Sequence, residues 1–165
     1  MTKNISTNMR VLKPSRKKPK QGDVFVLQMP DAMYSFGRVI NTDANASLGP
    51  GAQLIYLFKF CSPSKDLPEI SELRTDALLL PPPLMTNLQA WSRGYFETID
   101  QVPLGPGEKL GIHCFYNSIF DRYMDEYGIE QSHPTEPVGK YGLESYRTID
   151  DAVSKALGFP LAPDS

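Results

Sequence analysis

Apolar residues alternate along residues 22–40 in the pattern of two strands joined by a tight turn. Val24 and Val26 fall on one face of the first strand and Phe25 and Leu27 on the other, because successive strand side chains point to opposite faces. A Pro-Asp-Ala sequence then supplies turn chemistry, since proline fixes φ and aspartate accepts hydrogen bonds from the backbone that follows it. Because both faces are apolar, the pattern predicts a hairpin inside the core.

A third strand is predicted over residues 53–61, which carry aromatic and branched side chains on both faces. Residues 41–51 lack hydrophobic periodicity and are rich in turn-forming residues, so they predict a loop. Residues 88–99 predict a further strand pair or a bulged strand. Three consecutive strands at short spacing indicate a meander, and we expect a curved antiparallel sheet bent into an SH3-like half-barrel.

Two C-terminal helices are predicted to complete an α+β domain. In the first, apolar side chains recur at spacings of three and four residues, which places them on one helix face. These side chains are Tyr116, Ile119, Phe120, Tyr123, Met124 and Tyr127. The second helix is predicted over residues 149–157, with Thr148 as its N-cap and Gly158 as its stop signal. The predicted core consists of Val24, Val26, Phe36, Val39, Ile55, Leu57, Trp91, Phe120 and Tyr123.

Charge divides the chain into a basic start and an acidic remainder. Residues 1–22 contain seven basic residues and no acid, whereas residues 23–165 contain ten basic residues and nineteen acids, a net charge of −9. We therefore expect a basic, flexible leader over residues 1–21 and one domain over residues 22–165, a length that suits a single core. The leader could contact a polyanion or serve only as a solvated segment.

The two cysteines, Cys61 and Cys114, are too few for a disulfide framework, and we expect both to be buried free thiols in a reducing compartment. No run of about 18 apolar residues suggests a membrane span. The N-terminal residues lack the apolar segment of a secretory signal. The sequence thus predicts a cytoplasmic protein without membrane contact.

The chain carries no convincing catalytic or metal-binding constellation. His113 and Cys114 are adjacent, but neighbouring strand residues point to opposite faces, so a nucleophile pair is not expected. No spacing matches a zinc site, a nucleophile elbow or a phosphate-binding loop. We expect no catalytic residue, no metal ligand and no cofactor.

Several segments together resemble a known family. They are residues 18–25 (Lys-Pro-Lys-Gln-Gly-Asp-Val-Phe), residues 34–39 (Tyr-Ser-Phe-Gly-Arg-Val), and Pro82-Pro83 followed by residues 91–96 (Trp-Ser-Arg-Gly-Tyr-Phe). In order and spacing, over about residues 18–100, they resemble immunity protein 26 of bacterial polymorphic toxin systems. The resemblance implies a small cytoplasmic protein that binds a cognate toxin domain and blocks it without enzymatic activity.

Other function classes remain open from the residues alone. An acidic domain suits a basic partner, so a basic nuclease is one candidate toxin. The basic leader is not explained by that account, and the competing hypothesis is a small-barrel nucleic-acid-binding module that uses it as an arm, although nucleic acid is the less favoured partner. A third class, an endoribonuclease toxin, would need an acid–base pair that the chain does not offer.

The expected contact residues form two groups. Acids on the polar face of the first helix are either a solvated surface or a patch that attracts a basic partner. These are Asp121, Asp125, Glu126 and Glu130. Tyr34 and the nearby Asp31, at the first hairpin turn, are the candidate anchor, because affinity usually depends on a few desolvated aromatic or arginine side chains.

Overall fold

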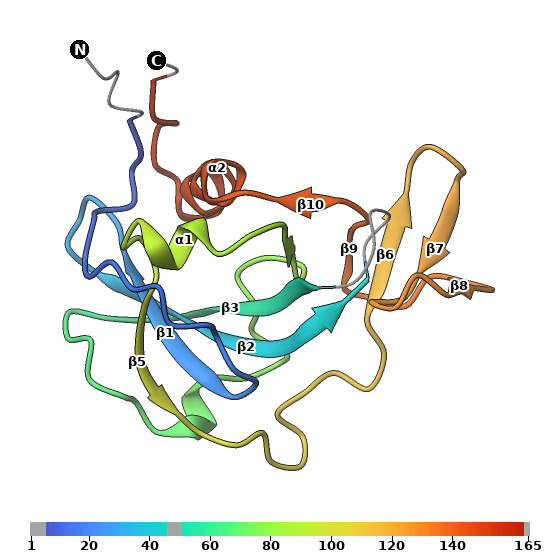
Figure 1. Ribbon diagram of the computed structural model, residues 1–165, viewed down its shortest axis with the longest axis horizontal. Helices are drawn as coiled ribbons and strands as arrows, with labels where there is room; N and C mark the ends of the chain where they lie inside the picture. Colours follow the sequence, from blue (N-terminus) through green and yellow to red (C-terminus); the bar gives the residue numbers. More distant parts are fainter. Residues whose placement is uncertain (1–5, 46–50, 164–165) are drawn as a thin grey trace.

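The computed structural model describes residues 6–45 and 51–163, and in this part of the chain it contains two β-sheets and two α-helices (Figure 1). The larger sheet has six strands in the order β10-β4-β3-β2-β1-β5. Its strands are β1 (Asp23–Gln28), β2 (Tyr34–Ala44), β3 (Ala52–Ser62), β4 (Leu84–Met85), β5 (Glu97–Gln101) and β10 (Leu143–Glu144). Neighbouring strands run antiparallel, except that β10 and β4 are parallel.

The predicted hairpin is confirmed, since β1 pairs with β2 and Val26 lies opposite Phe36. Gly37 lies opposite Phe25, and a Cβ atom at this glycine would overlap the Phe25 ring. The glycine therefore permits a close approach between the ring and the strand. β2 continues through Ala44 into the predicted loop, and residues 46–50 of that loop lie outside the described residues.

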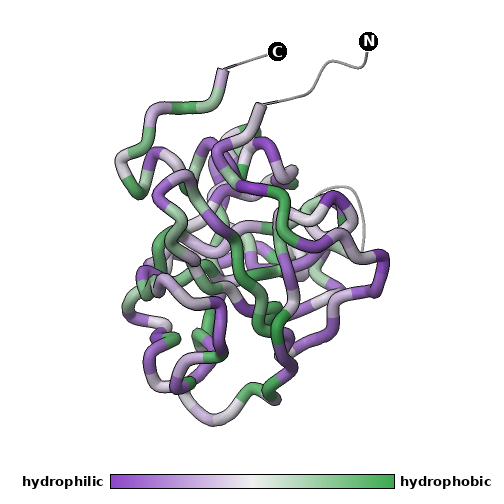
Figure 2. The backbone as a smooth tube through the Cα atoms, turned by 90° about the vertical axis from the view of Figure 1, so that its left-hand side faces the viewer, coloured by the Kyte–Doolittle hydropathy of each residue, from purple (hydrophilic) through white to green (hydrophobic). Residues whose placement is uncertain are grey.

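Apolar side chains pack on both faces of the larger sheet, as the sequence predicted. One cluster joins one sheet face to α1 (Gln89–Ser92) and α2 (Tyr146–Leu157), which lie over it in Figure 1. The other cluster fills the opposite face and reaches the second sheet through Phe115. Figure 2 shows the hydrophobic segments gathered in the middle of the molecule. Of the predicted core, seven residues are buried: Val24, Val26, Phe36, Val39, Ile55, Leu57 and Trp91.

The second predicted C-terminal helix is confirmed but begins earlier, at Tyr146. Its N-cap is Ser145, whose Oγ accepts a hydrogen bond from the Thr148 N–H at 3.3 Å. Thr148 Oγ1 in turn accepts from the Ser145 N–H at 2.9 Å, so Thr148 belongs to a capping box three residues inside the helix. Gly158 ends the helix with φ 81°, as expected of a glycine C-cap.

The first predicted C-terminal helix is wrong, because this part of the chain forms a β-hairpin. β6 (Cys114–Asn117) pairs with β7 (Arg122–Met124), and Tyr116 lies opposite Tyr123 with ring centroids 5.3 Å apart. An apolar spacing of three and four residues also fits two short strands around a four-residue turn, so periodicity alone could not separate them. The Asn117 side chain begins that turn by accepting a hydrogen bond from the Ile119 N–H at 3.0 Å.

This change of element corrects the predicted core. Phe120 lies exposed at the hairpin turn, and Tyr123 is only half-buried. The predicted strand pair over residues 88–99 is also partly wrong, since α1 precedes β5 there. A 3₁₀ turn, η1 (Ile70–Glu72), lies between β3 and β4. The SH3-like half-barrel and the pair of C-terminal helices are not confirmed; the observed fold is mostly β with mixed sheets that do not close, which is compatible with the α+β class.

The described part of the basic leader lies against the domain. Met9 is buried, and the N–H groups of Met9 and Asn8 donate to the Asp150 carboxylate of α2 at 2.7 and 3.0 Å. The Asn8 side chain also donates to the Pro160 carbonyl at 2.7 Å, so the N-terminal segment lies beside the segment that follows α2 (Figure 1). The flexibility of the leader and the domain boundary at residue 21 stay predictions.

Asp150→Asn is expected to remove a pH-dependent part of the stability. Burial raises the pKa of the Asp150 carboxyl, although the hydrogen bonds from Met9 and Asn8 oppose this rise. The folded protein therefore binds this proton more tightly than the unfolded chain. The contribution of Asp150 to stability is fully present below its unfolded pKa and is lost as the pH rises through the raised folded pKa.

Urea unfolding at a series of pH values tests this expectation. The free energy of unfolding of the wild type should fall, relative to that of Asp150→Asn, as the pH rises through this window. Asp66→Asn, which neutralises an exposed acid in the loop after β3, is the matched control and should follow the wild type. A constant difference between wild type and Asp150→Asn at all pH values would contradict the prediction.

Both cysteines are free thiols; Cys114 is buried as predicted, whereas Cys61 is exposed. The expectation that both are buried is therefore wrong for Cys61, which lies near the end of β3. Within the described residues, no helix is long and apolar enough to cross a membrane.

Candidate functional site

The second sheet carries the four acids that the sequence singled out. Its strands lie in the order β8-β7-β6-β9, where β8 is Glu130–Gln131 and β9 is Val138–Lys140. Figure 1 shows this sheet at one side of the molecule, beyond the C-terminal end of β2 and away from the chain termini. The prediction that these acids share one face of a helix is therefore wrong. They lie on the turns and strands of a small projecting sheet.

Two of the acids shape the turns of this sheet. Asp121 has φ 52°, and its Oδ1 accepts a hydrogen bond from the Tyr116 hydroxyl at 2.6 Å. Asp125 Oδ1 accepts from the N–H groups of Tyr127 and Ile129, both at 2.9 Å. Aspartate suits such positions because its carboxylate bonds nearby backbone donors and because it tolerates positive φ. Asp121 is exposed and Asp125 half-buried, so both also carry charge at the surface.

The other two acids have different surroundings. Glu130 is exposed and forms a loose ion pair with Arg122 at 3.6 Å. Glu126 instead turns inward, where its carboxylate pairs with Nδ1 of the buried His113. Three of the four predicted acids can thus face a partner, and Glu126 has a structural role that the sequence did not predict.

His113 links the two sheets through a chain of hydrogen bonds. Its Nε2 lies 2.6 Å from the hydroxyl oxygen of the buried Tyr56, which also accepts from the Leu110 N–H at 2.9 Å. Because the Glu126 carboxylate accepts, Nδ1 carries the proton that faces it, and Nε2 of that tautomer accepts from the Tyr56 hydroxyl. Burial raises the pKa of Tyr56 to about 12, so the phenol keeps this proton at neutral pH. Both ring nitrogens of His113 are occupied, which gives it a structural role.

Large apolar side chains are exposed on the same sheet. Nine are exposed among the described residues, and five of them fall within residues 112–129. These are Ile112, Ile119, Phe120, Tyr127 and Ile129. Ile119 and Phe120, at the β6–β7 turn, are 83% and 66% exposed. Exposed apolar side chains that gather on one element are typical of protein-binding surfaces.

We call the exposed side chains of the β6–β7 and β7–β8 turns, together with the start of β8, the hairpin surface. It consists of Ile119, Phe120, Asp121, Tyr127, Ile129 and Glu130. The apolar spacing placed Ile119, Phe120 and Tyr127 on one face of a predicted helix, so these residues were not predicted as contact residues. The Asn117-Ser118 pair before Ile119 is a turn signal that could have identified the exposed position.

The predicted anchor lies elsewhere. Asp31 Oδ1 accepts from the Met33 N–H at 3.0 Å in the β1–β2 turn, and Tyr34 is the half-buried first residue of β2. The second sheet contacts the other end of β2, where the Asn41 side chain donates to the Tyr127 hydroxyl at 3.0 Å. A strand rises about 3.3 Å per residue, so Tyr34 and the C-terminal end of β2 are roughly 30 Å apart. The structure does not bring Asp31 and Tyr34 together with the acids.

Comparison with known proteins identifies the family. The family model described as immunity protein 26 matches residues 20–125, more than half of the chain, and this span runs from the start of the larger sheet through the β6–β7 hairpin. Neither a curated protein nor a solved structure matches. The family match agrees with the resemblance found in the sequence and extends it to the hairpin. This chain belongs to the immunity protein 26 family.

Proposed function

We propose that this protein neutralises a bacterial toxin domain by binding it, without catalysis, in the cytoplasm of the cell that produces both. Its membership of an immunity protein family supports this role. The observation that carries the proposal is the exposure of Ile119 and Phe120 on a projecting hairpin. An inhibitor that acts by binding needs such apolar contact residues, since they supply affinity when a partner desolvates them.

The hairpin surface has the mixed chemistry of a protein interface. Phe120 and Tyr127 are aromatic, and aromatic side chains are enriched among the residues that dominate binding energy. Asp121 follows Phe120 at the turn before β7, and Glu130 lies close in sequence to Tyr127, after the turn at the other end of β7, so each turn carries negative charge. A basic toxin domain fits this surface, because complementary charge accelerates encounter and apolar contacts slow dissociation. A basic nuclease is the toxin class that we propose.

Neutralising two acids of the hairpin surface is expected to slow association with the toxin. Asp121→Asn keeps an oxygen for the Tyr116 hydroxyl and a residue that tolerates positive φ, and Glu130→Gln removes an exposed charge. Stopped-flow or surface plasmon resonance measurements at low salt give the two rate constants. The double variant should associate with the toxin roughly 3–10-fold more slowly than the wild type, with little change in the dissociation rate.

The matched control is Asp66→Asn/Glu69→Gln, which removes two exposed acids from the loop after β3. It should associate at close to the wild-type rate. If the control slows association as much as the hairpin variant does, net charge rather than the hairpin surface directs the encounter. An association rate of the hairpin variant equal to that of the wild type at low salt would contradict the role given to these acids.

A further inference from the structure

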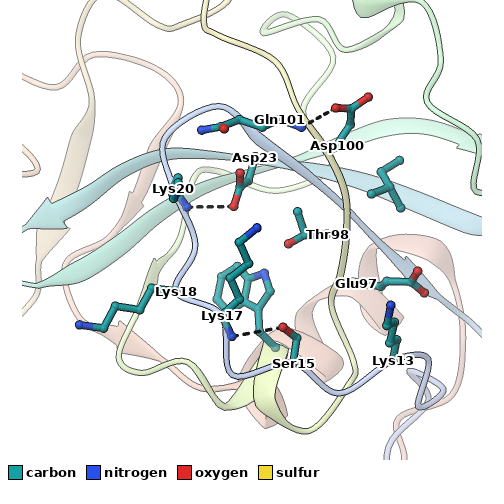
Figure 3. A pocket seen from close by; sticks show the side chains of 12 residues that line it. Lys13, Ser15, Lys17, Lys18, Lys20, Asp23, Glu97, Thr98, Asp100 and Gln101 are labelled. Carbon is teal, nitrogen blue, oxygen red and sulfur yellow. Dashed lines mark hydrogen bonds between the residues drawn. The ribbon is translucent and has the colours of Figure 1, made fainter.

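A cavity of about 350 Å³ lies between the N-terminal segment and strand β5 (Figure 3). Side chains of the N-terminal segment form one wall, and residues of β5 form the other. The first wall carries Lys13, Lys17, Lys18 and Lys20, and the buried Trp91 also lines the cavity. We call this cavity the lysine groove.

The lysine wall is held in place by backbone contacts. The Leu12 N–H donates to the Gly94 carbonyl at 2.7 Å, and the Ser15 N–H donates to the Trp91 carbonyl at 3.0 Å. Gly94 has φ 87°, and a Cβ atom there would lie 2.9 Å from Pro14, so the glycine lets the segment pack closely on the chain after α1. The groove is therefore a feature of the fold.

The lysines of the groove carry positive charge that is not paired with an acid in the described part of the chain. Among the described residues, none of the four lysine ammonium groups forms an ion pair or a side-chain hydrogen bond. The carboxylates that line the groove are already bonded. Asp23 accepts from the Lys20 N–H at 2.9 Å, Glu97 pairs with Lys65 at 3.1 Å, and Asp100 accepts from the Gln101 N–H at 2.7 Å. The four lysines thus outnumber the three carboxylates that line the groove, and Glu97 is already paired with Lys65, which leaves an excess of positive charge.

The opposite wall is the edge of the larger sheet. β5 pairs with β1, and no other strand of the described residues pairs with its outer edge. An edge strand directs backbone N–H and C=O groups outward, where an extended peptide can add as a further strand. In addition, the Trp91 indole N–H is buried without an acceptor among the described residues, which leaves a donor unsatisfied beside the groove.

We propose that the lysine groove binds an extended acidic peptide segment of a partner protein. The segment adds to the outer edge of β5 and places its carboxylates against Lys13, Lys17, Lys18 and Lys20. The site is separate from the hairpin surface and has the opposite charge, so this inference does not depend on the proposed toxin contact. It assigns a binding role to the basic leader, which the toxin-binding account leaves unexplained.

A peptide fits the groove better than a nucleic acid does. One wall is a strand edge, whose backbone groups match those of another polypeptide. The aromatic ring that lines the groove, Trp91, is buried and so offers no exposed face on which a base could stack.

The test uses the full chain and an acetylated, amidated hexapeptide in which glutamate alternates with threonine and valine. Trp91 is the single tryptophan of the chain, so its fluorescence and its indole N–H resonance report directly on the groove. At low salt, the peptide should shift that resonance together with the amide resonances of residues 13–20 and 97–101. Lys17→Glu/Lys20→Glu should weaken binding by at least about tenfold.

Two comparisons separate this site from general charge attraction. Lys59→Glu/Lys109→Glu makes the same change in net charge at exposed positions outside the groove and should bind the peptide as the wild type does. A peptide with lysine in place of glutamate should not bind. The proposal is overturned if the acidic peptide does not bind at low salt, or if the two double variants weaken binding equally. Tighter binding of a six-nucleotide uridylate than of the acidic peptide would also overturn it, in favour of a nucleic-acid site.

Discussion

Ile119→Ser/Phe120→Ser is expected to weaken toxin binding by about 100-fold or more while leaving the fold intact. These two side chains are the most exposed large apolar groups on the hairpin surface, so their removal costs the free protein little packing. Truncating an interface anchor commonly costs 2 kcal/mol or more, and about 1.4 kcal/mol corresponds to a tenfold change in Kd. Isothermal titration calorimetry with the purified cognate toxin domain measures the loss.

The control for this prediction is Val11→Ser/Leu161→Ser. It removes two other exposed apolar side chains, which do not belong to the second sheet or its turns. That variant should bind with wild-type affinity, and both variants should keep the wild-type thermal midpoint to within a few degrees. Wild-type affinity of Ile119→Ser/Phe120→Ser would show that the hairpin surface is not the toxin contact.

Arg38→Met is expected to produce the largest loss of stability, about 3–5 kcal/mol, because it breaks a buried ion pair and leaves its partner uncompensated. The Arg38 side chain is fully buried, and one terminal nitrogen lies 2.7 Å from Glu108 Oε1. The other donates to the carbonyls of Val102 and Pro103 at 2.7 and 3.2 Å. Glu108 also accepts from the Gly105 N–H at 2.6 Å, so Arg38 and Glu108 together hold residues 102–108 of the connection after β5.

Urea unfolding of the purified variant measures this loss. Arg74→Met is the matched control, since Arg74 and Asp76 form an ion pair at a similar distance, 2.6 Å, in which both side chains are exposed. Water screens that pair, so its removal should leave the free energy of unfolding unchanged within error. Equal losses in the two variants would contradict the special role of burial at Arg38.

The larger sheet was predictable from local patterns. The alternation along residues 22–40 and the apolar run over residues 53–61 predicted three strands with two buried faces, and β1, β2 and β3 confirm them. The end of α2 was also predictable, because the residue after a helix often adopts a positive φ, which glycine permits, and Gly158 does so with φ 81°. Strand pairings that join distant segments, such as β10 with β4, depend on contacts that no local pattern encodes.

The hairpin surface was only half predictable. Its acids were predicted as contact residues from the sequence. Phe120 was instead predicted to be buried, because the three- and four-residue spacing of apolar residues suggested a helix with Phe120 on its core face. Whether a side chain is covered depends on which distant segment packs against it, and Phe120 stays exposed among the residues that the structure describes. The inward orientation of Glu126 also depends on distant segments of the chain. Its partner His113 is held by a hydrogen bond to the buried Tyr56 of β3, which lies far away in the sequence.

Titration of the toxin's activity with this protein tests the central claim most directly. The cognate toxin domain is purified, and its activity is measured against increasing amounts of the full chain. A stoichiometric inhibitor should reduce the activity in proportion to its amount, to an end point at equimolar protein, and separation of the complex should restore active toxin. Activity that persists in the presence of excess folded protein would contradict neutralisation by binding. Progressive inactivation by much less than an equimolar amount would contradict the absence of catalysis.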